Sequence, residues 1–199
     1  MSKKASYPSS KGRIMAEPND PRVVRTRTDV AKAALDILLS EGWTGLTHGR
    51  VAKHSGYSRA TIYTHWPTQM DLARDAFAAY EEMPHFLPTG DLRADLTGEV
   101  QSFVDAMVNY HLDRGLSMLA EKAQTSAEVS EIRDRFVAAG EGPMRQTLDA
   151  VEKPEFREAA TLMLCGMVTH SVLMHGRAPD SSVLSSAVDL VISGAKLES

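Results

Sequence analysis

The side chains with the clearest chemistry lie together in residues 42–70. This stretch contains no Asp or Glu, although 26 of the 199 residues in the chain are acidic. It does contain three cations, Arg50, Lys53 and Arg59. Cations without neighbouring carboxylates can bind phosphates, and an arginine can pair with the edge of a guanine base. The stretch therefore indicates a DNA-facing surface. The alternative is a helical hairpin whose charges are only solvated.

Two short helices joined by a tight turn are predicted between Leu46 and Trp66. Thr47 and Ser58 each precede one of these helices, and their hydroxyls can accept hydrogen bonds from the unpaired N–H groups of a helix start. Gly56 falls in the turn, where a positive φ is usually required. The inner apolar face consists of Val51, Tyr57, Ile62 and Trp66. This arrangement is typical of a helix-turn-helix. The outer face of its second helix consists of Arg59, Ala60, Thr61, Tyr63, Thr64 and His65.

The segment Thr28–Leu72 resembles the DNA-binding domain of the TetR family of bacterial transcriptional regulators. The family pattern is roughly T-x-x-x-(V/I/L)-A-x-x-(A/S)-G-V-S-x-(G/A)-(T/S)-(L/I)-Y-x-H-F-x-x-K-x-x-L. Matching positions are Thr47, Val51, Ala52, Ser55, Gly56, Ser58, Ala60, Thr61, Ile62, Tyr63, His65, Trp66 and Leu72. Two positions depart from it: Tyr57 replaces the usual Val, and Gln69 replaces a Lys that meets a phosphate.

The resemblance implies a role in DNA binding for individual residues. Arg59 and Thr61 would contact base edges, with Arg59 on a guanine and Thr61 on a thymine methyl group or a polar edge. The phosphate contacts would be Thr47, Ser58, Tyr63, His65 and Gln69, which position the protein without reading sequence. Bases or phosphates would also lie near Gly49, Arg50, Ala60 and Thr64. The alternatives are core packing for Tyr63 and a structural capping role for His65.

Composition and charge divide the chain into a basic front and an acidic body. Residues 1–66 hold 11 Lys and Arg against 5 Asp and Glu, whereas residues 67–199 hold 11 against 21. We expect a flexible basic tail over residues 1–21, a DNA-binding head over 22–67 and a regulatory body over 68–199. The tail either follows the DNA backbone and minor groove or is merely solvated.

The body is expected to be all-α, because no strand-like alternation and no repeat appears. Apolar residues at helical spacing predict helices over Thr28–Glu41, Thr68–Met83, Asp91–Leu112, Ser117–Thr125, Ser126–Val151, Glu155–His175 and Val183–Leu197. We expect Gly115 to interrupt the pattern, and a kink or break at Gly140, Gly142 and Pro143.

The last two predicted helices are apolar on nearly all sides. Such helices must be buried all round, and in a chain of this length a partner subunit is the natural cover. The family resemblance implies that these two helices pack against their copies as a four-helix bundle. A homodimer formed through the last two helices is therefore predicted.

A small-molecule site is expected in the body, because the resemblance implies a ligand-responsive regulator. The body is rich in Met, a side chain that fills irregular apolar cavities. The lining is predicted to include Phe103, Met107, Tyr110, Phe136, Met163 and Met167, with His111 or His170 as the polar anchor. The alternative is that each of these Met residues simply belongs to the core.

Other function classes find no support in the sequence. The single Cys165 excludes an internal disulfide framework and a Cys metal cluster, and His170 and His175 do not share a helix face. No phosphate-binding glycine loop, nucleophile elbow or apolar carboxylate pair is present, so we expect neither an enzyme nor a cofactor. There is no run of 18 apolar residues and no hydrophobic leader, so a cytoplasmic protein without a membrane partner is expected.

The sequence thus predicts a dimeric repressor that binds a palindromic operator in double-stranded DNA. An unknown apolar or amphipathic effector would favour a spacing of the two heads that no longer fits successive major grooves. The alternative function is an all-helical dimeric scaffolding protein that has lost DNA binding. Gln69, in place of the usual Lys, is the one feature in favour of that alternative.

Overall fold

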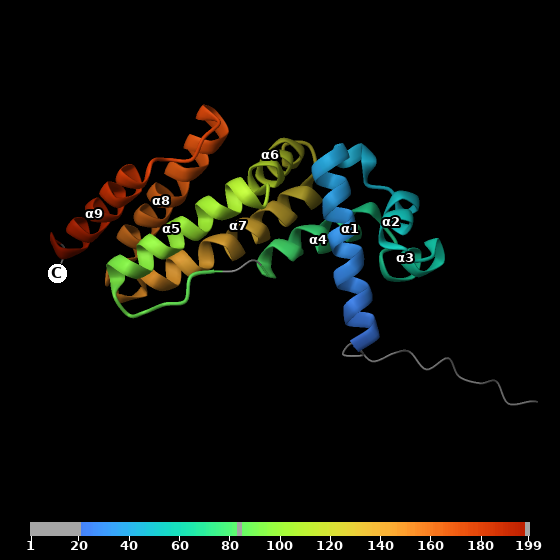
Figure 1. The fold of residues 1–199 in the computed structure, drawn as a ribbon, viewed down its shortest axis with the longest axis horizontal. Coiled ribbons are helices and arrows are strands. Elements are labelled where there is room, and N and C mark those ends of the chain that lie inside the picture. Colours follow the sequence, from blue (N-terminus) through green and yellow to red (C-terminus); the bar gives the residue numbers. More distant parts are fainter. Residues whose placement is uncertain (1–20, 83–84, 198–199) are drawn as a thin grey trace, which may run out of the picture.

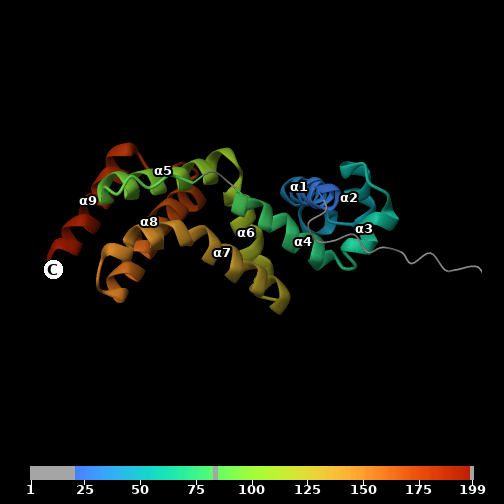
Figure 2. The same cartoon turned by 90° about the horizontal axis from the view of Figure 1, so that it is seen from below.

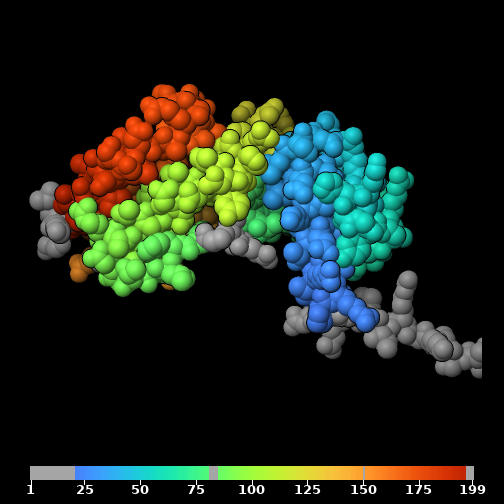
Figure 3. All heavy atoms as spheres, in the orientation of Figure 1, coloured from blue at the N-terminus to red at the C-terminus, as the bar shows by residue number. Residues whose placement is uncertain are grey.

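The computed structural model describes residues 21–82 and 85–197, and every regular element in these ranges is helical. The all-α prediction is therefore confirmed. Figure 1 shows an elongated molecule with the first three helices at one end and the last two at the other. The space-filling view shows the same division (Figure 3). The predicted tail lies outside the described residues, apart from Pro21, which begins the first helix.

The head consists of α1 (Pro21–Gly45), α2 (His48–Ser55) and α3 (Arg59–His65). Helix α1 begins seven residues before the predicted Thr28 and is interrupted at Gly42, where φ is 70°. A glycine reaches this left-handed conformation cheaply, which is why the regular helix ends there. The core of the head contains the fully buried residues Val30, Ala34, Leu38, Leu46, Val51, Ile62 and Trp66.

Helix α4 (Gln69–Ala78), continued by the 3-10 turn η1 (Ala79–Glu82), joins the head to the body. A capping box starts this helix: Thr68 Oγ1 accepts a hydrogen bond from Asp71 N at 3.1 Å, and Asp71 Oδ2 accepts one from Thr68 N at 3.0 Å. The buried face of α4 packs against both α1 and the body helix α7. A movement of α4 therefore changes the position of the head relative to the body.

The body contains α5 (Leu92–Asn109), α6 (Leu112–Ala123), α7 (Ala127–Thr147) with the 3-10 turn η2 (Leu148–Ala150), α8 (Pro154–His175) and α9 (Ser181–Leu197). Figure 2 shows α5 lying alongside α9, and these two helices are in contact. Both α8 and α9 lie at the end of the molecule farthest from α2 and α3 (Figure 1). No helix within the described ranges is long and apolar enough to cross a membrane.

The interruption predicted at Gly115 is wrong, and the alternative of a break near Pro143 is not observed. Gly115 is buried within α6, where an added Cβ would lie 3.5 Å from Tyr80 Oη, an ordinary contact distance. The actual break comes earlier, at His111, which has a φ of 57°. Helix α7 continues through Pro143, since the residue whose carbonyl loses its helical partner there, Ala139, is exposed and can bind water instead.

Candidate functional site

The helix-turn-helix is closed by the hydrogen bonds that the sequence predicts. Thr47 Oγ1 accepts from Arg50 N at 3.3 Å, and Ser58 Oγ accepts from Thr61 N at 3.1 Å. Gly56 has a φ of 79° and donates its N–H to Ala52 O at 3.0 Å. These contacts end α2 and start α3 within three residues, which sets the angle at which α3 leaves the head.

The outer face of α3 is exposed. Its exposed residues are Arg59, Ala60, Tyr63, Thr64 and His65, while Ile62 and the following Trp66 are buried. Thr61 is half-buried, and its hydroxyl lies 2.9 Å from Ser58 Oγ. The guanidinium of Arg59 lies over Gly49, where an added Cβ would come within 3.1 Å of Nη2. No carboxylate in the described part of the chain forms an ion pair with Arg59, so its charge is available to DNA.

His48 belongs to the same surface, although sequence reasoning did not select it. Its ring stacks on that of Tyr63, with centroids 4.0 Å apart and planes 4° from parallel. His48 Nε2 also lies 2.7 Å from the Trp66 carbonyl oxygen. Tyr63 is 54% exposed, so it is a supported surface residue and not a core residue. Nothing in the spacing of these two residues signals the contact, because it depends on how α2 crosses α3.

Gln69 requires a correction. Its Nε2 donates to Trp43 O at 2.8 Å and to Leu46 O at 2.9 Å, so both amide hydrogens are used inside the head. The turn between α1 and α2 leaves these two carbonyls without a helical partner, and the start of α4 supplies one. The predicted phosphate contact by this amide is therefore not supported. Arg50, in turn, forms an ion pair with Glu41, just outside the acid-free stretch.

A cavity of about 380 Å³ lies between α5, α6, α7 and α8. Its apolar and aromatic wall includes Tyr80, Phe103, Ala106, Leu112, Leu116, Phe136, Val137, Met144, Cys165 and Leu173. Its polar lining consists of His85, Glu99, Ser102, Arg133, Glu141 and Thr169. Burial raises the pKa of the Cys165 thiol to about 12, so this thiol is neutral. Apolar walls with a few convergent polar groups are typical of small-molecule sites.

Of the eight predicted effector residues, Phe103 and Phe136 line this cavity. Met107 is closed into the core, and Tyr110 and His111 are exposed at the end of α5. Three more lie on the surface of α8, namely Met163, Met167 and His170. The prediction chose the wrong side of α8. The side that faces the cavity carries Cys165, Thr169 and Leu173. A helix that is apolar all round carries no signal of which side faces a cavity.

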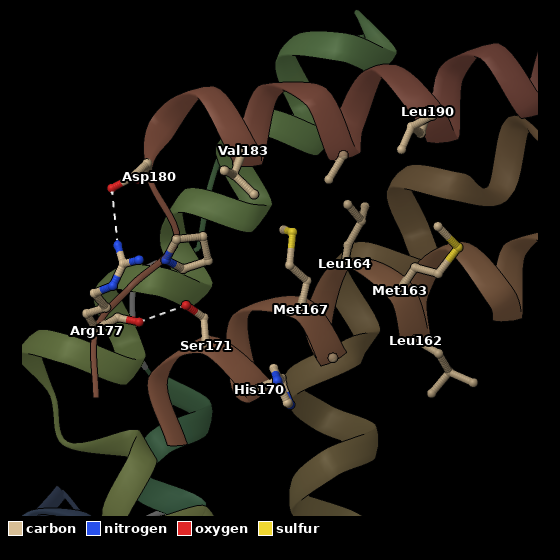
Figure 4. Close-up of a pocket in the computed structure, with 13 residues that line it drawn as sticks. Leu162, Met163, Leu164, Met167, His170, Ser171, Arg177, Asp180, Val183 and Leu190 are labelled. Atoms are coloured by element: carbon tan, nitrogen blue, oxygen red, sulfur yellow. Dashed lines mark hydrogen bonds and ion pairs between the residues drawn. The ribbon is translucent and has the colours of Figure 1, made fainter. Parts of the chain in front are cut away.

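The residues on the other side of α8 form an apolar surface groove with α9. In Figure 4, Met167 and Val183 lie between the two helices, and Leu190 projects from α9 toward α8. Four large apolar side chains of its lining are exposed: Leu162, Met163, Val183 and Leu190. Within the described ranges, no group of three or more His, Cys, Asp or Glu residues could hold a metal ion.

Aromatic rings connect the cavity to the head. Phe136 lies edge-to-face with Phe77 of α4 at 5.6 Å and with Tyr80 of η1 at 5.5 Å. Phe77 also lies 6.1 Å from Trp43, whose Nε1 donates to Met118 O of α6 at 3.4 Å. Burial raises the pKa of the Tyr80 hydroxyl to about 12, and this hydroxyl donates toward the Tyr110 carbonyl at 3.2 Å. A change in the position of the Phe136 ring would therefore act directly on α4, through its contact with Phe77.

Comparison with known proteins agrees with this geometry. Residues 30–76 match the family of bacterial regulatory proteins called the tetR family, and residues 86–191 match the tetracyclin repressor-like C-terminal domain. An uncharacterized HTH-type transcriptional regulator of Mycobacterium bovis is 27% identical over 187 residues, which cover 90% of this chain and 92% of that protein.

Solved structures share the fold over most of the chain. The TetR family transcription regulator SCO0332 is 28% identical, with a TM-score of 0.62 over 84% of this chain and 97% of its own. The regulator FadR of Bacillus subtilis, solved in complex with stearoyl-CoA, is 15% identical, with a TM-score of 0.60 over 83% and 97%. The chain therefore belongs to the TetR family of DNA-binding transcriptional regulators, which are not enzymes.

Proposed function

We propose that the chain is a dimeric repressor that binds a palindromic operator in the cytoplasm and is released by a small molecule. The observation that carries this proposal is the contact of the cavity wall with α4. Phe136 belongs to the wall and touches Phe77 and Tyr80. Through this contact, a molecule in the cavity would act directly on the helix that joins the head to the body.

The DNA contact would be made by the exposed face of α3 and the start of α2. Arg59 has a free guanidinium and would pair with a guanine, while the methyl group of Thr61 would meet a thymine. Backbone contacts would come from Thr47, Ser58, Tyr63 and His65, with Gly49, Arg50, Ala60 and Thr64 close to the DNA. His48 would support Tyr63 through the stacked rings. Gln69 is left out of this set, because its amide is bonded within the head.

The dimer would form through α8 and α9. These helices expose four large apolar side chains in one groove, and a monomer in water gains nothing from this exposure. Packing them against a second copy would remove them from water and relate the two heads by a two-fold axis. Two heads related by such an axis match a palindromic site.

Release would follow from a shift between two arrangements of α4. An effector that displaces Phe136 changes the surface on which Phe77 packs, and the first residue of α4 is tied to the α1–α2 connection. If one arrangement fits DNA and the other fits the occupied cavity, effector and operator oppose each other equally. The likeness of fold to FadR, solved with stearoyl-CoA, supports a body able to bind a small molecule.

The test is a binding assay with the DNA upstream of the gene. The wild-type protein should bind one palindromic segment as a dimer, and small molecules that raise its melting temperature should lower that affinity. A folded dimer that binds no segment of this DNA would contradict the proposal. The scaffolding alternative loses its supporting feature, because the internal hydrogen bonds of Gln69 explain why Lys is absent there.

A further inference from the structure

Glu99 is a buried carboxylate in the wall of the cavity. Its side chain is only 7% exposed, and it shares the cavity with Phe103, Phe136 and other apolar residues. Removal from water raises the pKa of this carboxyl, with the nearby Asp95 adding to the rise and His85 opposing it. A carboxylate placed this deeply is ordinarily paired with a cation, because burying an isolated charge is costly.

Among the described residues, the basic side chain that forms an ion-pair contact with Glu99 is His85. Its Nδ1 lies 3.8 Å from Glu99 Oε2, and the ring is partly exposed. The segment that carries His85 is anchored, since Asp95 accepts hydrogen bonds from Thr89 N at 2.7 Å and Gly90 N at 3.0 Å. An imidazole does not supply the permanent charge of an arginine or a lysine. Glu99 is thus not matched by a fixed cation within the described residues.

The other charges in the cavity wall already have partners. Glu141 accepts from Arg145 at 2.7 Å, and Arg145 also pairs with Glu158. Arg133 donates to Asp134 at 2.6 Å and to Ser130 at 2.9 Å, so its guanidinium is held on α7 itself. Arg145 is shared between two carboxylates, so the charged groups at the cavity keep an excess of negative charge. Within the described residues, Glu99 is the cavity carboxylate that forms no ion pair with an arginine or a lysine.

We propose that the effector of this cavity is a lipophilic organic cation. Its ammonium or similar group would lie against Glu99, and its apolar body would contact Phe103 and Phe136. Inside a cavity with apolar walls, an opposite charge is attracted more strongly than in water, and aromatic rings also attract cations. A carboxylate ligand would instead meet the negative charge of Glu99. This proposal rests on the effector role described above only for its effect on DNA.

The test compares three probes with the same naphthalene ring: 1-naphthylmethylammonium, 1-naphthylmethanol and 1-naphthoate. Calorimetric titration of the full-length protein without DNA should give the ammonium compound at least about tenfold higher affinity than the other two. Glu99→Gln keeps the size of the side chain and removes its charge. This variant should bind the ammonium compound about tenfold more weakly and the alcohol with unchanged affinity, so the preference for the cation should disappear.

Two further variants make the result specific. Glu131→Gln removes one charge at an exposed position of α7 outside the cavity and should keep the preference. His85→Arg places a fixed cation beside Glu99 from a partly exposed position, where folding is not at risk. This variant should weaken the ammonium compound and favour 1-naphthoate.

Three results would overturn the proposal: equal binding of the alcohol or the naphthoate, no binding of any probe, or an unchanged ammonium affinity in folded Glu99→Gln. Operator binding, measured separately, distinguishes the two proposals. A protein that binds its operator without any preference for the cation overturns this inference alone. A protein that prefers the cation but binds no operator overturns the repressor function and leaves the cavity assignment standing.

Discussion

At the scale of single residues, the surface of α3 depends on side chains that are left free and side chains that hold others in place. Arg59 extends over Gly49 without a carboxylate partner in the described part of the chain. His48 supports the ring of Tyr63, and Ser58 holds the start of α3. The exposed face of α3 thus combines an arginine that forms no ion pair in the described part of the chain with side chains that are held in place by their neighbours.

Arg59→Ala should weaken operator binding selectively. A bidentate contact of arginine with guanine contributes roughly 1–3 kcal/mol of discrimination, while non-specific binding rests mainly on phosphates. Fluorescence anisotropy with operator and scrambled DNA would measure both. Arg114→Ala, an exposed cation on α6, is the matched control and should change neither. Full operator affinity and specificity in Arg59→Ala would contradict the base contact.

Gln69→Met should lower stability without removing a phosphate contact. The variant keeps the length of the side chain but leaves the carbonyls of Trp43 and Leu46 without their donors, which costs about 1–3 kcal/mol. Urea denaturation would measure the loss. The affinity of the folded variant for DNA should be unchanged, and an equal loss of affinity for operator and scrambled DNA would place Gln69 at a phosphate after all.

The affinity for 1-naphthylmethylammonium should rise with pH through the ionisation of Glu99. The pKa of this carboxyl is raised above its ordinary value of 4.5, so the neutral form persists to higher pH than in an exposed glutamate. Only the ionised form attracts the cation, so lowering the pH through that pKa loses affinity. Calorimetry at several pH values would measure this, and in Glu99→Gln the part of the pH dependence that Glu99 causes should vanish.

At the scale of elements, α4 connects the two functions of the chain. It begins at Gln69, which is bonded to the α1–α2 connection, and its buried Phe77 meets Phe136 at the cavity. The capping box at Thr68 fixes the start of this helix. A helix held at one end by the head and touched near the other by the cavity wall can transmit a small displacement.

Phe136→Leu should uncouple the effector from DNA. The shorter side chain still fills part of the core but loses the edge-to-face contacts with Phe77 and Tyr80. Operator affinity should persist, while saturating effector should no longer release the DNA. Phe103→Leu is the control, since it changes the same cavity wall from α5 and should alter effector affinity but not release at saturation. Normal release in Phe136→Leu would show that coupling follows another route.

At the scale of the whole molecule, the apolar side chains of α8 and α9 serve two purposes. Some close the core of one subunit, and Val188 is among them with 1% of its surface exposed. Others face outward at the end of the molecule farthest from the head, as Leu190 does with 66% exposed (Figure 1). The distinction decides which substitution tests association and which one tests folding.

Leu190→Glu should produce folded monomers. A carboxylate in the proposed α8–α9 interface would have to be buried without a partner, whereas in the monomer it meets water. Sedimentation velocity and circular dichroism would report association and folding together. Val188→Glu should instead unfold the subunit, and Leu87→Glu, an exposed position between η1 and α5, should leave the dimer intact. A wild-type protein that sediments as a monomer at micromolar concentration would contradict the dimer.

The helices and the DNA-binding head could be predicted from the sequence because the signals for them are local. Capping by Thr47 and Ser58 involves residues three apart, and the turn at Gly56 depends on the freedom of one glycine. The acid-free stretch is likewise a property of neighbouring residues. None of these three signals depends on how the helices pack against one another.

The cavity and its anchor were decided by tertiary packing alone. Phe103 lines the cavity and Met107 and Met167 do not, because packing decides which sides of α5 and α8 face the cavity. Gln69 could be assigned only once the carbonyls of Trp43 and Leu46 lay beside it. Glu99 looks like any surface acid in the sequence. Its charge gains significance from burial, which arises only when four helices close around one space.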